Sequence, residues 1–200
     1  MTVRRYFRVI AFRSKEVMLK LTALIACIPV VLGMSAADAA ILGPYASSCH
    51  KGSNKPAILV HIEGLKNRDG LLRVQAYDAV EKSYFEKGQY VQRVEIEPPA
   101  TGSVDICLPV AKSGAYTVLA RHDINKNGHI DHDDGGGFSG NPSMSLMDVA
   151  LKHKPSLKAT TISVGNSISD VTIIMKYVQG LSFKPIAASD EESDNNEVKR

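Results

Sequence analysis

The residues at positions 123–134 carry the clearest chemical pattern in the chain. Oxygen-bearing side chains recur at positions 1, 3, 5, 9 and 12 of this stretch, with glycine at position 6 and an apolar residue at position 8. This is the spacing of an EF-hand-type calcium loop, in which alternate side chains of a tightly turning backbone converge on one cation. Glycine at position 6 supplies the positive φ that the sharp turn requires.

The predicted calcium ligands are five side-chain oxygens and one backbone carbonyl. They belong to Asp123, Asn125, Asn127, Asp131 and Asp134, with His129 contributing the carbonyl. Three carboxylates and two neutral amides suggest an affinity of about 10⁻⁴ to 10⁻³ M, as in extracellular modules. The loop holds four acidic residues against one lysine, so a cation would relieve their repulsion. The alternative is an Asx-rich turn around Asn127 and Gly128 that needs no ion.

The flanks of the loop and its histidines limit this interpretation. A strand pattern and a glycine run flank the loop where an EF-hand has helices, and Asp at position 12 reaches less far than Glu. His122, His129 and His132 raise a zinc hypothesis, since imidazole and carboxylate groups bind zinc. Their spacing matches no familiar zinc motif, and we expect them to be solvent-exposed.

A catalytic site is harder to find in the sequence. Neither Gly-x-Ser-x-Gly nor His-Glu-x-x-His is present. The glycine-rich residues 135–140 follow acidic residues that would repel a phosphate. We therefore predict that the protein is not an enzyme. The alternative is a metal-dependent hydrolase that uses the loop carboxylates and His122 as an acid/base set.

The elements that must position the loop are predicted to be strands. Apolar residues alternate with polar ones in segment after segment, at 58–62, 72–76, 94–96, 104–108, 116–120, 159–164 and 171–177. A turn at 67–70 predicts that the first two form a hairpin. Residues 135–140 are too glycine-rich for a regular strand, and residues 145–153 are a short helix or an edge strand. The pattern predicts an all-β fold, a single antiparallel β-sandwich of about seven strands.

The ends of the chain predict export. Residues 1–39 combine a basic segment, an apolar run and an Ala37-Asp38-Ala39 cleavage site, which together are typical of a secretory signal peptide. The alternatives are an uncleaved membrane anchor and, from residues 24–27, a lipoprotein cleavage box. The protein is then periplasmic or extracellular, with no transmembrane span after cleavage. Residues 40–55 are predicted to be a flexible lead-in, 56–180 the sandwich domain and 181–200 a disordered polar tail.

Charge and cysteine content exclude one class of partner and leave one question open. The chain has 24 basic and 21 acidic residues, and residues 1–39 hold six and two of these, which leaves 18 and 19. A nucleic-acid partner therefore has no electrostatic support. Cys49 and Cys107 remain after leader removal. An exported protein permits a disulfide between them, but two unpaired thiols fit the sequence equally well.

Several stretches resemble a family of secreted bacterial proteins of unknown function. They are GLLRVQAYD at 70–78, GAYTVLARHDINKNGHID at 114–131, Gly137-Phe138-Ser139 and the strand that ends at Tyr177. The resemblance covers roughly residues 56–177 and implies a prealbumin-like or carboxypeptidase-regulatory-like β-sandwich. It implies no activity. The family usually has a longer segment, with a proline and an acidic residue, between Asp131 and the Gly-Phe-Ser stretch.

Together these patterns predict an exported binding or structural module. Calcium would neutralise the acidic loop and fix the glycine-rich stretch around Phe138, which with Tyr116 or Tyr77 is a candidate ligand surface. The partner is an unknown envelope protein, peptide or carbohydrate, which the sequence does not rank.

Overall fold

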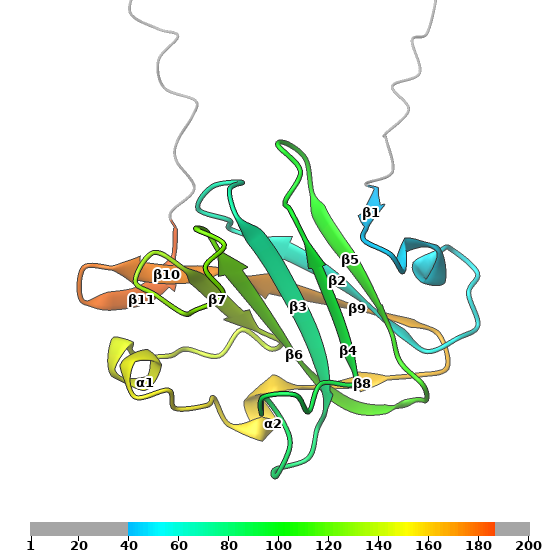
Figure 1. Ribbon diagram of the computed structural model, residues 1–200. Coiled ribbons are helices and arrows are strands. Elements are labelled where there is room, and N and C mark those ends of the chain that lie inside the picture. Colours follow the sequence, from blue (N-terminus) through cyan, green and yellow to red (C-terminus); the bar gives the residue numbers. More distant parts are fainter. Residues whose placement is uncertain (1–39, 187–200) are drawn as a thin grey trace, which may run out of the picture. The chain divides into compact units, whose positions relative to one another are not determined.

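The computed structural model describes residues 40–186, which form two β-sheets. The predicted leader at 1–39 and the predicted tail beyond residue 186 lie outside the described residues. The first sheet has four strands, which are labelled in Figure 1. In spatial order they are β1 (Ile41–Leu42), β5 (Val104–Pro109), β2 (Ala57–Glu63) and β9 (Ile168–Ile174).

The second sheet has seven strands and carries the acidic loop. In spatial order it contains β11 (Ser182–Pro185), β10 (Lys176–Gln179), β7 (Gly135–Phe138), β6 (Gly114–Asp123), β3 (Leu71–Asp78) and β4 (Gln92–Ile96), with β8 (Thr161–Val164) also paired to β6. Three short helices complete the described chain: η1 (Ala46–Cys49), α1 (Leu146–Ala150) and α2 (Leu157–Thr160). Within residues 40–186, no helix is long and apolar enough to cross a membrane.

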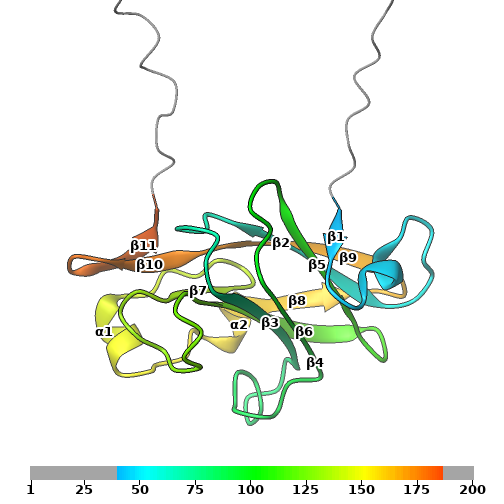
Figure 2. The same cartoon turned by 45° about the horizontal axis from the view of Figure 1, so that its top comes forward.

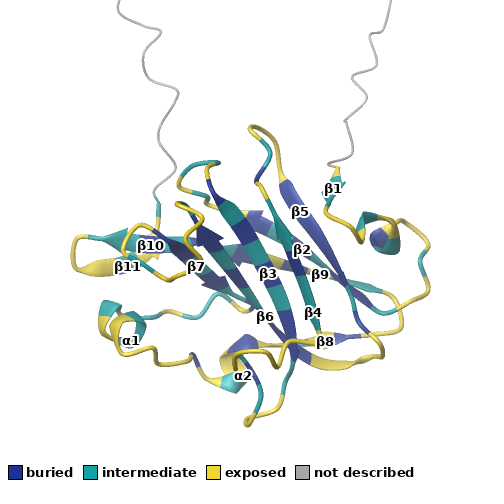
Figure 3. Cartoon of the chain, in the orientation of Figure 1, coloured by how far each residue is buried: buried dark blue, intermediate teal, exposed yellow. Residues whose placement is uncertain are grey.

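The predicted all-β sandwich-like fold is confirmed, and its core lies between the two sheets. Figure 2 shows the layer of β2, β5 and β9 beside the layer of β3, β4 and β6. Ile58 and Val60 of β2 are fully buried, as are Val74 of β3 and Val118 of β6. Burial alternates along these strands in Figure 3 because successive side chains point to opposite faces. The pairs β1–β5 and β2–β9 are parallel, and the other strand pairs are antiparallel.

The predicted hairpin of the first two strands is wrong. β2 pairs with β5 and β9, whereas β3 pairs with β4 and β6 in the other sheet. Gly64 and Gly70 have positive φ, and the intervening segment crosses between the sheets. A Cβ at Gly70 would lie 2.1 Å from the Asp123 carbonyl oxygen, so close packing on the end of β6 adds a steric reason for glycine at this bend.

The predicted last strand is divided between the two sheets. Val171 and Ile173 lie on β9, and Tyr177 lies on β10, with Met175 between the strands. All four side chains are buried, as the alternation predicts. The chain therefore passes from one layer to the other while one face of it stays against the core.

The prediction that residues 135–140 form no regular strand is wrong for β7. Gly135–Phe138 pairs with β6 on one side and β10 on the other. A Cβ at Gly135 would lie 2.3 Å from the Tyr177 ring, and one at Gly137 would lie 2.5 Å from Ile173 Cγ2. Glycine is used here because the facing side chains fill the space that a Cβ would need, not because the chain turns.

The chain before β2 is ordered and covalently tied to the sandwich. A disulfide joins Cys49 of η1 to Cys107 of β5, which settles the alternative left open by the sequence. Ile41–Leu42 adds a parallel strand to β5. Residues 40–55 thus differ from the flexible lead-in predicted, and residues 182–185 of the predicted tail form the edge strand β11.

His61 links three strands on the outer face of the four-stranded sheet. Its Nδ1 lies 2.7 Å from Asp105 Oδ1 on β5, and its Nε2 lies 3.2 Å from Asp170 Oδ1 on β9. Burial alone would lower the pKa of His61, but its hydrogen bonds and charge interactions with the two aspartates raise it overall. The protonated imidazole is therefore the form that the fold stabilises.

We expect this link to stabilise the protein in acid. Because the His61 pKa is raised on folding, its contribution is complete below the unfolded pKa of about 6.5 and is lost as the pH rises through the folded pKa. Urea unfolding should show His61→Gln costing about 0.5 kcal/mol more at pH ~5.5 than at pH ~8.5, a partly exposed ion pair being weakened by solvent. His129→Gln serves as the control, because the His129 side chain is exposed. Equal costs of His61→Gln at both pH values would contradict the expectation.

Candidate cation-binding site

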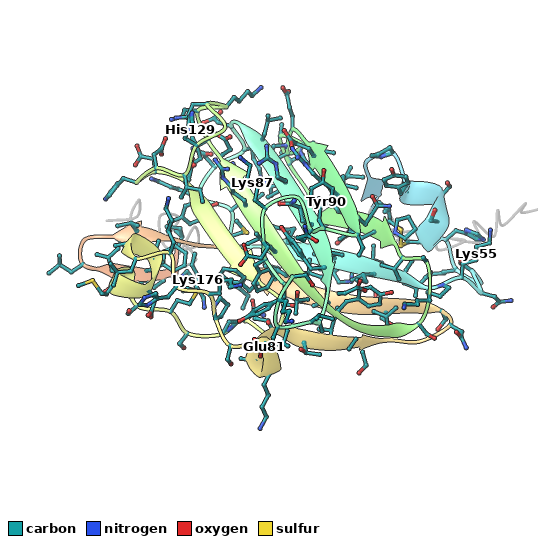
Figure 4. The ribbon with its side chains drawn as sticks, turned by 60° about the horizontal axis from the view of Figure 1, so that its bottom comes forward. Lys55, Glu81, Lys87, Tyr90, His129 and Lys176 are labelled. Carbon is teal, nitrogen blue, oxygen red and sulfur yellow. A yellow bond between two sulfur atoms is a disulfide. The ribbon has the colours of Figure 1, made fainter. Side chains whose placement is uncertain are left out.

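The acidic loop closes the hairpin of β6 and β7. β6 ends at Asp123, β7 begins at Gly135, and His122 pairs with Gly135 in the antiparallel register. This pairing brings the first and last positions of the loop together. Asp123 and Asp134 are 4% and 5% exposed, respectively. His129 lies near the outer end of the loop in Figure 4.

Side-chain oxygens shape the loop backbone through a series of Asx turns. Asp123 accepts hydrogen bonds from the N–H groups of Asn127 at 3.2 Å and Gly128 at 2.9 Å. Asn125 Oδ1 accepts from Asn127 N–H, and Asn127 Oδ1 accepts from His129 N–H. Lys126 and Gly128 have positive φ, which bends the chain back on itself. The spacing therefore specifies a tight turn, as the sequence indicates.

Three of the six predicted ligands converge on the guanidinium of Arg121. Arg121 Nη2 lies 3.4 Å from Asp123 Oδ2 and 3.4 Å from Asp134 Oδ2, and it donates to the His129 carbonyl. Its Nη1 donates to the Gly128 carbonyl at 3.2 Å. The Arg121 side chain is only 14% exposed. Positions 1, 7 and 12 of the loop thus surround one positively charged group.

The other three predicted ligands form a second, separate cluster. Asn125 and Asn127 donate from Nδ2 to Asp131 Oδ2 at 2.7 and 3.0 Å. These amides, Asn125 first, and the N–H groups of Asp133 and Asp134 lower the pKa of Asp131. The loop therefore does not bring all six residues together in this conformation. Among residues 40–186, no three His, Cys, Asp or Glu side chains are grouped to hold a metal ion.

Asp134 ties the end of the loop to its beginning. Its Oδ1 accepts from the Ile124 N–H at 3.1 Å, and its Oδ2 accepts from the Asp131 N–H at 3.3 Å. Asp133, by contrast, is exposed and lies 3.6 Å from Lys66 Nζ. The buried carboxylates of Asp123 and Asp134 therefore accept backbone hydrogen bonds that fix the shape of the loop, whereas the carboxylate of Asp133 faces outward.

The expectation that all three histidines are solvent-exposed is wrong for His122, which is fully buried. Its Nε2 lies 2.6 Å from the Asp69 carbonyl, and its Nδ1 lies 2.7 Å from the Tyr177 hydroxyl. A carbonyl only accepts, so in the neutral ring Nε2 carries the proton and Nδ1 accepts from Tyr177. The Tyr177 hydroxyl in turn accepts from the Lys66 N–H, and burial raises its pKa to about 12. His122 therefore joins the loop base to the crossing after β2. His129 and His132 are exposed, as expected.

Arg121 is the site residue that the sequence pattern missed. The calcium-loop motif begins at Asp123 and includes no residue of the strand before it. The signal was available, because Arg121 and Asp123 are two residues apart on a strand and so share a face. A basic residue on a strand, two positions before an acidic loop, is placed so that its side chain can contact the carboxylates of that loop.

Of the two tyrosines expected beside Phe138, one lies in its aromatic cluster. Phe138 packs on Phe85 with ring centroids 5.1 Å apart, and Phe85 packs on Tyr77 at 5.5 Å. Phe85 has φ +57°, a left-handed conformation that aims its ring between the other two. Tyr116 is instead part of the hydrophobic core and donates from its hydroxyl to the Lys112 carbonyl. Tyr77 and not Tyr116 therefore belongs to the aromatic cluster.

Fold and site together define a class: a small β-sandwich-like domain with an acidic hairpin loop that surrounds the guanidinium of Arg121. A family model described as an uncharacterized protein conserved in bacteria, DUF2141, matches residues 60–172, which is more than half of the chain. The chain belongs to this family. No curated protein and no solved structure matches it.

Proposed function

We propose that the protein is an exported binding or structural module whose 123–134 loop binds one calcium ion. The observation that carries the proposal is the convergence of Asp123, Asp134 and the His129 carbonyl on Arg121 Nη2. Calcium would replace a single positive charge with a double one at that point. The Asp131 side chain and the Asn125 and Asn127 amide oxygens would turn inward to complete an oxygen shell.

Arg121 supports this proposal because its guanidinium places a positive charge beside the buried carboxylates of Asp123 and Asp134. Two nearly buried carboxylates cost free energy unless a positive charge or hydrogen bonds compensate them. The guanidinium supplies part of this compensation, and its Nε has no hydrogen-bond partner among the described residues. Calcium must displace Arg121, and this competition keeps the calcium affinity modest.

Export is supported by two independent features. Residues 1–39 have the pattern of a signal peptide, and the disulfide suits an oxidising compartment. Calcium at millimolar concentration is available outside the cytoplasm, where an affinity of about 10⁻⁴ to 10⁻³ M is sufficient. The hydrolase alternative gains no support from the geometry, because His122 is buried and both its ring nitrogens are engaged.

Calcium is expected to raise the free energy of unfolding of the purified protein. At a calcium concentration of about 1 mM, the affinity above corresponds to about 0.4–1.4 kcal/mol. Asp123→Asn should abolish the increase, because it removes a buried ligand charge. Asp133→Asn is the matched control, since it removes an exposed carboxylate of the same loop and should leave the increase unchanged. Urea unfolding with calcium or with chelator measures all three proteins.

Arg121→Gln separates calcium binding from simple loop stability. Without calcium the variant should be less stable than the wild type, because the buried carboxylates lose their cation. With calcium the difference should shrink, since the ion no longer competes with the guanidinium. Identical unfolding midpoints with calcium and with chelator, in both the wild type and Arg121→Gln, would refute calcium binding.

A further inference from the structure

One end of the domain carries three large apolar side chains that the core does not bury. Figure 1 and Figure 2 both show the turn between β10 and β11 at the same end as α1, and α1 contacts β11. Leu181 in this turn is 91% exposed, and Met147 and Leu151 of the α1 segment are 64% and 58% exposed. Residues 141–160 and 176–186 are called the α1–β11 end below.

Local structure does not explain why these three positions are apolar. The β10–β11 pairing ends at Gln179 and Ser182, so Gly180 and Leu181 form a two-residue turn, in which Gly180 has positive φ. Polar residues are the usual partners of glycine in such turns. No residue of α1 is buried, so its apolar side chains add nothing to the core. The structure therefore presents apolar surface at this end to the outside.

The α1–β11 end is also strongly basic. It contains five lysines and one acidic residue, whereas the rest of residues 40–186 contains eleven basic and thirteen acidic residues. The acidic residue, Asp148, is engaged in its own helix, where its Oδ2 accepts from the Ser145 N–H and hydroxyl. Positive charge is thus concentrated at one end of a domain whose remainder is slightly negative.

Three lysines of this end leave their charge to an outside partner. They are exposed and form no ion pair with a carboxylate of the described residues: Lys152, Lys158 and Lys184. The other two are engaged, since Lys154 pairs with Glu86 and Lys176 donates to backbone carbonyls. Figure 4 places Lys176 on the opposite side of the domain from Lys55. The exposed positive charge therefore accompanies the exposed apolar side chains.

We infer that the α1–β11 end docks on the surface of an anionic phospholipid bilayer. Leu181, Met147 and Leu151 would enter the boundary between headgroups and acyl chains, and the exposed lysines would meet lipid phosphates. A protein partner would need a matching surface of roughly 800 Å², whereas lipid adapts to a projecting turn and a short helix. The docking is independent of calcium, because the residues that carry it lie outside the 123–134 loop.

Co-sedimentation with lipid vesicles tests the inference. The protein used begins at residue 40, so that the apolar run within residues 1–39 cannot itself bind lipid. Vesicles of equal parts phosphatidylglycerol and phosphatidylcholine should bind it at least about tenfold more tightly than phosphatidylcholine alone, and about 0.5 M salt should weaken this binding. Equal binding to both vesicles, or no binding at about 1 mM lipid, would overturn the inference.

Two substitutions assign the binding to the α1–β11 end. Leu181→Asn keeps a turn residue but removes the most exposed apolar side chain, and should weaken binding to the anionic vesicles about tenfold. Lys184→Gln should weaken it about fivefold. Tyr45→Asn and Lys55→Gln are the matched controls beside η1, which lies across the domain from α1 in Figure 1, and should bind as the wild type does. Unchanged binding in both Leu181→Asn and Lys184→Gln would contradict the assignment.

Two further measurements distinguish this surface from other binding segments and partners. Residues 187–200 follow β11 directly and hold five acidic and two basic residues, so removing them should strengthen binding to the anionic vesicles. Weaker binding after their removal would show that these residues make the contact instead. Sedimentation without lipid should give a monomer. A dimer that Leu181→Asn dissociates would assign the α1–β11 end to a contact between two copies and overturn the inference.

Discussion

Reduction of the Cys49–Cys107 disulfide is expected to lower the free energy of unfolding substantially. The bond closes a loop with a sequence separation of 58. On the chain-entropy model a loop of this length contributes about 4 kcal/mol, by restricting the unfolded chain. This is a large part of the roughly 5–15 kcal/mol that stabilises a typical domain. Equilibrium urea unfolding with and without a phosphine reductant measures the loss.

The double variant Cys49→Ala/Cys107→Ala separates the cross-link from the packing of the sulfur atoms. Cys49 and Cys107 are almost fully buried beside Ala57. The reduced wild type keeps both sulfurs and loses only the bond, whereas the double variant loses both. The double variant should therefore be slightly less stable than the reduced protein and should not respond to reductant. A reduced wild type that unfolds at the same urea concentration as the oxidised one would contradict the expectation.

Strand positions were predictable from the sequence, but strand partners were not. Alternation identified β2, β3, β5 and β6 because their inner residues must be apolar to build one core. Which strand pairs with which depends on contacts between distant segments, such as β2 with β9, a parallel pair that no short turn can produce. The 67–70 turn looked like a hairpin turn because its residues fit any tight bend.

The loop shows the same division between local and distant information. Its turn was predictable, since each Asx hydrogen bond joins residues no more than five positions apart. The sequence predicted that Asp123 and Asp134 share an ion, but it did not predict the strand pairing that brings them together. That pairing joins β6 to β7, a strand made mostly of glycine, which gave no strand pattern in the sequence. The contacts of His61 with Asp105 and Asp170 were not predicted, because these residues are 44 and 109 positions away from it in the sequence.

The second large effect is expected from Gly135→Ala in β7. The new Cβ would lie 2.3 to 3.0 Å from three atoms of the Tyr177 ring. Tyr177 cannot move aside easily, because it is 1% exposed and its hydroxyl bonds to His122 and to the Lys66 N–H. Overpacking of a core typically costs about 1–3 kcal/mol, and contact with a fixed ring places this variant at about 3 kcal/mol. Urea unfolding measures the cost.

Gly136→Ala, one residue further along the strand, is the matched control. Its Cβ would point to the outer face, where the nearest atom is Phe183 Cζ at 3.7 Å, an ordinary contact. The two substitutions have the same effect on backbone entropy, so their difference isolates the steric term. We expect Gly136→Ala to change the free energy of unfolding by less than about 0.5 kcal/mol. Equal costs for the two variants would show that the close approach of the Tyr177 ring is not what requires glycine at position 135.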